Sequence, residues 1–195
     1  VDGNLVLTPY SNGDIFALNL TNGAEIWKQS LVNIEQSETS NSFSDIDANP
    51  VVLKSLIIIA SNSGRIFAFN KKNGNQVWVQ YLNTTQTPVV NGNSLFVLHN
   101  NKEIVNLDLK NGKIRWITEI EESLKDKNNY LWLSPVLVNS KLIVVGGNKS
   151  LIILNPYDGS LENKYSLPSI PVTSPLIIKK KVFIMFKNSS IYTIE

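Results

Sequence analysis

The side chains of this 195-residue chain that could act as acids, bases or nucleophiles are few and widely spaced. His99 is the only histidine, and it ends an apolar run beside two asparagines, a position more typical of a solvated turn than of a metal ligand. The sequence has no cysteine, which excludes disulfides, thiolate metal sites and cysteine nucleophiles. These residue types therefore argue against histidine or cysteine chemistry.

The carboxylates that stand out in the sequence fall in predicted turns and loops, without the fixed pairing that general acid–base catalysis requires. They are Asp14, Asp45, Asp47, Glu121, Glu122 and Asp126. Gly146 and Gly147 fit a tight hairpin better than a phosphate-binding loop, and calcium- and zinc-binding spacings are missing. The sequence predicts no catalytic residues, no metal site and no cofactor.

The composition argues against two further classes of function. Lys plus Arg is 18 and Asp plus Glu is 16, and this net charge of +2 is too small and dispersed for a protein that neutralises nucleic-acid phosphates. The longest apolar run, Leu56 to Ala60, is far shorter than the roughly 20 residues of a membrane-spanning helix. The chain begins with Val1 rather than Met, so we expect the sequence to be internal to a longer product.

An internal repeat organises the chain. Its motif is Asn or Asp, two residues, Asn or Asp, Gly, three residues and Trp. The copies are Asn19, Asn22, Gly23 and Trp27; Asn70, Asn73, Gly74 and Trp78; Asp108, Asn111, Gly112 and Trp116; and Asn155, Asp158 and Gly159, with Asn163 in place of Trp. The first positions are separated by 51 residues (19 to 70), 38 (70 to 108) and 47 (108 to 155), and Glu195 follows 40 residues later.

A proline before an apolar pair forms a second marker, at Pro50, Pro88, Pro135 and Pro175. Each unit contains four short apolar runs bounded by turn residues, as at 50–53, 56–60, 66–70 and 77–82 in the second unit. Four antiparallel strands in each unit of this length predict an all-β fold made of β-propeller blades. The expected boundaries are a partial blade 1–49, blades 50–87, 88–134 and 135–174, and a partial blade 175–195, within one segment 1–195.

The motif has a local physical explanation. A short side-chain acceptor at the end of the third strand can accept hydrogen bonds from the backbone of the turn, and Gly supplies the positive φ that the turn requires. The Trp lies on the outer strand, where it can bury its ring against the next blade and donate its indole N–H to a backbone carbonyl. We therefore predict that the motif residues dock one blade on the next.

These residues resemble the tryptophan-docking repeat, Ala-x-Asp-x-x-Thr-Gly-x-x-x-Trp, of the pyrroloquinoline-quinone (PQQ)-type β-propellers. The first copy matches through Ala17, Asn19, Asn22, Gly23 and Trp27, the second matches equally well, and Asn106 replaces the Ala in the third. The resemblance covers essentially the whole chain. It implies about four and a half blades of a ring that has seven or eight.

The resemblance implies two classes of function. Quinoprotein dehydrogenases of this family hold PQQ and calcium at the propeller centre, often against a vicinal disulfide that a chain without cysteine lacks. Members of the BamB type are non-enzymatic periplasmic lipoproteins that bind the periplasmic domains of the central subunit of the outer-membrane β-barrel assembly machinery. We expect a protein-binding scaffold of the second type, on the periplasmic side of the outer membrane. A PQQ-dependent dehydrogenase, or a subunit that senses a small ligand or redox state, is the alternative.

The connections of variable length are where we expect a partner surface, because loops on a rigid scaffold usually carry recognition. The two longest, 29–49 and 119–133, join an outer strand to the next inner strand and are rich in acidic residues. The predicted partner-binding residues are Phe43, Tyr130, Trp132, Glu121 and Glu122. The alternative for Trp132 is that it starts an inner strand and packs within its blade. If Phe43 and Trp132 are anchors, replacing them with Ala should weaken partner capture without unfolding the domain.

Overall fold

The structure, a computed structural model, describes residues 3–31, 48–61, 64–100, 102–120 and 130–194. Every helix or strand in these ranges is a β-strand, so the prediction of an all-β chain is confirmed. In the same ranges we find no helix with the length and apolar character needed to cross a membrane. The strands form three four-stranded and two three-stranded antiparallel sheets, as the repeat predicts.

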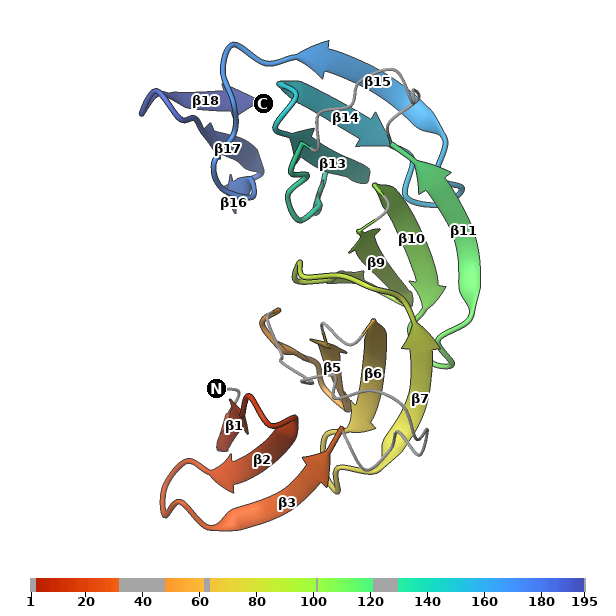
Figure 1. Ribbon diagram of the computed structural model, residues 1–195, viewed down its shortest axis with the longest axis vertical. Helices are drawn as coiled ribbons and strands as arrows, with labels where there is room; N and C mark the ends of the chain where they lie inside the picture. The colour runs from red at the N-terminus through yellow and green to blue at the C-terminus, as the bar shows by residue number, and fades with distance from the viewer. Residues whose placement is uncertain (1–2, 32–47, 62–63, 101, 121–129, 195) are drawn as a thin grey trace. The chain divides into compact units, whose positions relative to one another are not determined.

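The first compact unit, Val1–Thr87, contains two sheets, drawn in red to yellow in Figure 1. The first sheet has the order β1-β2-β3 and the second the order β4-β5-β6-β7, so each is a meander of neighbouring strands. Their bounds are β1 Leu5–Pro9, β2 Asp14–Asn19, β3 Glu25–Ser30, β4 Val51–Val52, β5 Leu56–Ser61, β6 Arg65–Asn70 and β7 Gln76–Tyr81.

The second compact unit, Pro88–Glu195, contains the other three sheets, each again a meander. The third sheet comprises β8 Val89–Asn91, β9 Ser94–His99, β10 Glu103–Asp108 and β11 Ile114–Glu119. The fourth comprises β12 Val136–Val138, β13 Lys141–Gly146, β14 Ser150–Leu154 and β15 Leu161–Ser166. The fifth comprises β16 Leu176–Ile178, β17 Lys181–Met185 and β18 Ile191–Ile194. The single segment 1–195 and its blade boundaries stay a prediction.

The four marker prolines each stand directly before the first strand of a sheet, at β4, β8, β12 and β16. Proline has no N–H to donate to a strand ladder, so this position outside the paired residues suits it. The proline and the Asn-Gly turn therefore bracket the three inner strands of each unit.

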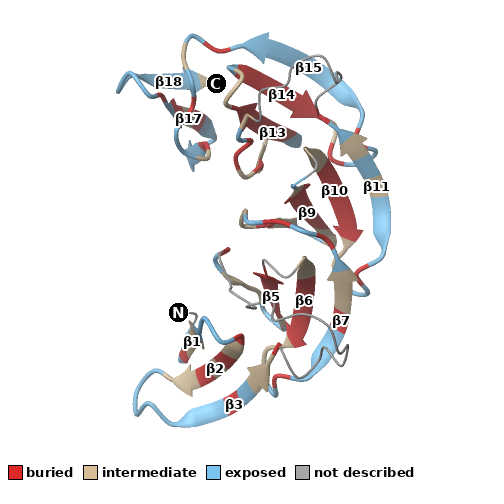
Figure 2. Cartoon of the chain, in the orientation of Figure 1, coloured by how far each residue is buried: buried red, intermediate tan, exposed pale blue. Residues whose placement is uncertain are grey.

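The middle strands of the four-stranded sheets, β5, β6, β9, β10, β13 and β14, are buried on both faces, whereas the outer strands β3, β11 and β15 are largely exposed (Figure 2). In β13 the side chains of Leu142 and Val144 join a core with the third sheet, while those of Ile143 and Val145 join a core with the fifth. Successive side chains of a strand point to opposite faces, and here both faces are buried. This explains why residues 142–145 of β13 are all apolar.

Each outer strand of the first four sheets contains a β-bulge that the sequence did not predict. The pairing shifts by one residue directly before the tryptophan position, leaving Ile26, Val77, Arg115 and Glu162 without a residue opposite. A bulge bends its strand and redirects a side chain. The bulged residue is apolar in the first two sheets and charged in the third and fourth.

Candidate functional site

The motif asparagines and aspartates hold the turn between the third and fourth strands of each sheet. In the second copy, Asn70 Oδ1 accepts from the N–H of Lys72 at 2.9 Å and Asn73 Oδ1 from the N–H of Asn75 at 3.1 Å. The same two bonds occur at Asn19 and Asn22, at Asp108 and Asn111, and at Asn155 and Asp158. Turns of this kind are stabilised when a side-chain oxygen accepts a hydrogen bond from the backbone N–H two residues later.

The motif glycines have a backbone conformation that other residues rarely adopt, with φ of 70° at Gly23, 73° at Gly74, 71° at Gly112 and 76° at Gly159. At Gly74 the missing side chain also makes room for an aromatic ring. A Cβ there would lie 2.7 Å from Cδ2 and Cε3 of Trp27. The indole N–H of Trp27 donates to the carbonyl of Lys71 at 3.0 Å.

The third copy makes the equivalent contacts within the second unit. The ring of Trp116 lies 2.6 Å from the position that a Cβ of Gly159 would take, and its N–H donates to the carbonyl of Pro156 at 3.3 Å. Thr118 Oγ1 donates to the carbonyl of Gly159 at 2.7 Å. An outer strand is thus held on the next sheet through one ring and several backbone acceptors.

The remaining motif positions differ in their surroundings. Gly23 has no described atom within 4 Å of where its Cβ would be. Trp78 is buried, and Asn163 lies on β15, whose residues are all exposed. The replacement of Trp by Asn163 is visible in the sequence, whereas the difference between Gly23 and Gly74 is not, because their copies share the same motif residues.

Asn106 takes the place that Ala17 and Ala68 have in the first two copies. Its side chain is buried, and Nδ2 donates to the carbonyl of Pro156 at 3.3 Å, beside the indole of Trp116. Asn106 Oδ1 has no hydrogen-bond partner in the described part of the chain. The amide therefore adds one bond to the docking contact and leaves one buried acceptor unpaired.

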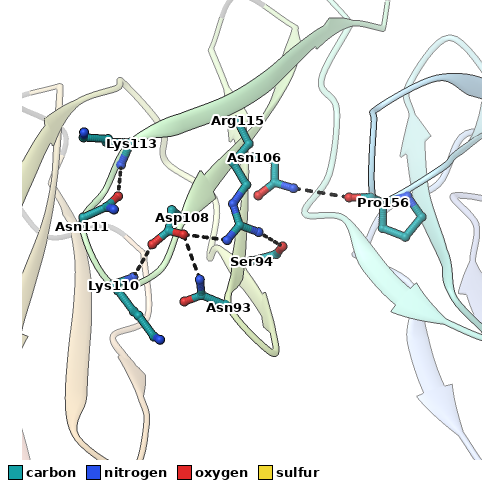
Figure 3. Close-up of polar contacts among 9 residues, drawn as sticks. All are labelled: Asn93, Ser94, Asn106, Asp108, Lys110, Asn111, Lys113, Arg115 and Pro156. Carbon is teal, nitrogen blue, oxygen red and sulfur yellow. Dashed lines mark hydrogen bonds and ion pairs between the residues drawn. The ribbon is translucent and has the colours of Figure 1, made fainter.

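Asp108 is the centre of a polar network that ties the three long strands of the third sheet (Figure 3). Its Oδ2 accepts from Arg115 Nη2 at 2.6 Å and from Asn93 Nδ2 at 2.8 Å, and Arg115 Nη1 donates to Ser94 Oγ at 2.9 Å. The Arg115 guanidinium is the main reason that the pKa of Asp108 lies below its ordinary value. Arg115 is the bulged residue, so the bulge places the guanidinium on this carboxylate.

His99 is not a solvated turn residue, contrary to the expectation from the sequence. It ends β9 opposite Glu103, and its Nδ1 lies 3.0 Å from Glu103 Oε2. Its side chain is only 17% exposed. In the described ranges we find no group of three or more His, Asp or Glu side chains arranged to hold a metal.

The predicted partner-binding residues fall into two groups. Phe43, Glu121 and Glu122 lie outside the described residues. Tyr130 is half-buried, and Trp132 is only 3% exposed, in the core between the third and fourth sheets. A Cβ on Gly146 would lie 2.8 Å from the Trp132 ring, so this glycine leaves space for the indole. The burial favours the packing role of Trp132, and its contact with a partner stays a prediction.

Comparison with known proteins agrees with this arrangement. The family model described as outer membrane protein assembly factor BamB matches residues 1–118. The protein of that name from Escherichia coli (strain K12) is 26% identical over 184 residues, which are 94% of this chain and 45% of that protein. The one from Legionella pneumophila (strain Paris) is 25% identical over 185 residues, or 95% of this chain and 47% of that protein. The chain thus spans about half the length of these relatives.

The crystal structure of BamB from Moraxella catarrhalis has the same fold. Its TM-score is 0.77 at 20% sequence identity, over 99% of this chain and 55% of that one. The predicted β-propeller class, with four-stranded antiparallel blades, is confirmed. The family match, which covers more than half of the residues, goes further than the fold. The chain belongs to the family of the outer membrane protein assembly factor BamB.

Proposed function

We propose that this chain is a protein-binding scaffold without enzymatic activity that acts in the assembly of outer-membrane β-barrel proteins. The observation that carries the proposal is that the motif side chains stabilise the fold. Their amide, carboxylate and indole groups bond the turns and the next sheet, as at Trp27 and Trp116. Membership of the BamB family supports the same role.

The proposed partner is the central subunit of the assembly machinery, through its periplasmic domains, and the proposed place is the periplasmic side of the outer membrane. The names of the relatives support an envelope role. The long connections that contain Phe43, Glu121 and Tyr130 are the proposed contact regions, because they are the variable part of a repeated scaffold.

The test is a calorimetric titration of the full-length gene product with the soluble periplasmic domains of the central subunit from the same organism. We expect saturable binding that Tyr130→Ala weakens. Tyr157→Ala is the matched control, because this exposed tyrosine lies in the turn between β14 and β15, at the other end of its sheet. Absence of binding by the folded wild-type protein would contradict the proposal.

A further inference from the structure

Lysines gather in the turns at one end of the second sheet. In a four-stranded meander, the turn between strands one and two and the turn between strands three and four lie at the same end, here called the paired-turn end. The lysines within these turns are Lys54, Lys71, Lys72, Lys110, Lys113, Lys179 and Lys180. Asp158 is the only acidic residue in the same turns, and its carboxylate already accepts from Ser160. In the second sheet these turns contain Lys54, Lys71 and Lys72 and no acidic residue, so the paired-turn end of this sheet is basic.

In the first compact unit, the paired-turn end of the second sheet borders a concave surface that faces the first sheet. The concavity has a volume of about 580 Å³. Lys54, from the turn between β4 and β5, and Lys71 and Lys72, from the turn between β6 and β7, line it. Leu5 and Ile26 of the first sheet supply apolar surface. Lysines are the only charged residues of the lining, so the surface is apolar in part and positively charged at its rim.

The backbone that forms this surface is well fixed. The N–H of Lys71 donates to the carbonyl of Ser55 at 2.9 Å, which joins the two lysine-bearing turns. Asn70 and Asn73 hold the second turn through their side-chain oxygens. Ile26 is the bulged residue of β3, and it remains 46% exposed in this surface. The lysine positions and the apolar patch are thus set by the repeat rather than by a loose loop.

We propose that this surface binds an acidic segment of a partner protein, with an apolar side chain of that segment seated against Ile26 and Leu5. The charge of the rim selects carboxylates, and the volume lies in the range of about 300–1,000 Å³ that concave ligand sites occupy. A membrane of anionic lipid is the less suitable occupant, because a flat layer of headgroups does not fill a concavity. The proposal rests on the proposed function only in taking the partner to be a protein.

The test is fluorescence anisotropy with a labelled peptide in which Glu alternates with Leu, and with its counterpart in which Lys replaces Glu. The wild-type protein should bind the acidic peptide and not the basic one, and added salt should weaken the binding. Replacing Lys54 and Lys72 together by Glu should raise the Kd by roughly tenfold. The matched control, Lys164→Glu with Lys187→Glu, makes the same change in net charge at residues that do not line the surface, and it should leave the Kd unchanged.

A second pair of variants tests the apolar part. Ile26→Asn should weaken binding of the acidic peptide, whereas Ile114→Asn should not, although both isoleucines have nearly the same exposure, 46% and 45%.

Binding to vesicles of phosphatidylglycerol tests whether anionic lipid is the occupant instead. Equal binding of both peptides, equal loss in the pocket and control variants, or binding of vesicles without binding of the acidic peptide would overturn the proposal. The calorimetric titration with the central subunit is a separate measurement, so either proposal can fail alone.

Discussion

Gly23 and Gly74 occupy the same position of the repeat, with φ of 70° and 73°, but their surroundings differ. An alanine at either site meets the strain of a left-handed conformation, about 1–2 kcal/mol. At Gly74 the new Cβ also meets the Trp27 ring, which is an overpacking cost of about 1–3 kcal/mol more. We therefore expect Gly74→Ala to lower the free energy of unfolding in urea more than Gly23→Ala does. Equal losses would show that ring docking on glycine adds nothing.

Asp108 should make stability depend on pH in the acid range. Its pKa in the folded protein is lowered below the ordinary 3.8, so the ionised carboxylate stabilises the fold above that pH. This contribution is lost as the pH falls through the folded-state pKa. We expect the free energies of unfolding of wild type and Asp108→Asn to differ most near neutral pH and to converge below about pH 3.8.

The matched control for Asp108 is Asp158. Hydrogen bonds from Ser160, rather than a cation, are the main cause of the lowered pKa of Asp158. Salt screens charge pairs, so added salt should shrink the effect of Asp108→Asn and leave that of Asp158→Asn nearly unchanged. An Asp108→Asn effect that is independent of both pH and salt would contradict the role given to Arg115.

Some features of the strands and turns could be predicted from the sequence, and others could not. Turn chemistry is local, so the Asn-Gly turns and the strands next to Pro50 or Pro88 could be predicted from residue types alone. The bulges at Ile26 and Arg115 could not, because they depend on how a strand bends to meet the next sheet. The burial of Trp132 depends on Gly146, fourteen residues away in the chain. A glycine ending a run of apolar strand residues was the available signal of close approach.

Trp132 joins the connection before β12 to the end of β13, through its bridge to Gly146 and its place in the core. Removing a buried ring of this size leaves a cavity, so Trp132→Ala should cost about 3–5 kcal/mol in the free energy of unfolding. Trp132→Phe should cost less, because the buried indole N–H has no partner among the described residues and Phe needs none.

Urea unfolding followed by circular dichroism measures both Trp132 variants. An unchanged midpoint for Trp132→Ala would contradict the packing role and restore this residue as a surface anchor. If the packing role holds, partner capture should be assayed with Trp132→Phe, since a loss in the Ala variant would reflect unfolding.

On the scale of the whole molecule, the composition sets which functions the fold can serve. A net charge of +2 argues against nucleic-acid binding through phosphate contacts, and the lack of cysteine argues against a quinone stacked on a vicinal disulfide. The copies of the repeat differ in their turn residues, as in the lysines at 71 and 72 against Pro156 and Tyr157 in the fourth copy. On the proposed scaffold, we expect these turn residues rather than the cores to distinguish one partner from another.

The two classes of function left open by the sequence differ in what the whole protein should bind. A quinoprotein takes up PQQ with calcium, whereas a scaffold has no use for either. We expect the full-length gene product to give no saturable change in the absorbance of PQQ when titrated in the presence of calcium, while it binds the periplasmic domains of the central subunit. A quinoprotein dehydrogenase titrated in parallel is the positive control. Saturable uptake of PQQ at micromolar concentration, with electron transfer to a dye on addition of an alcohol, would replace the scaffold proposal by the enzymatic one.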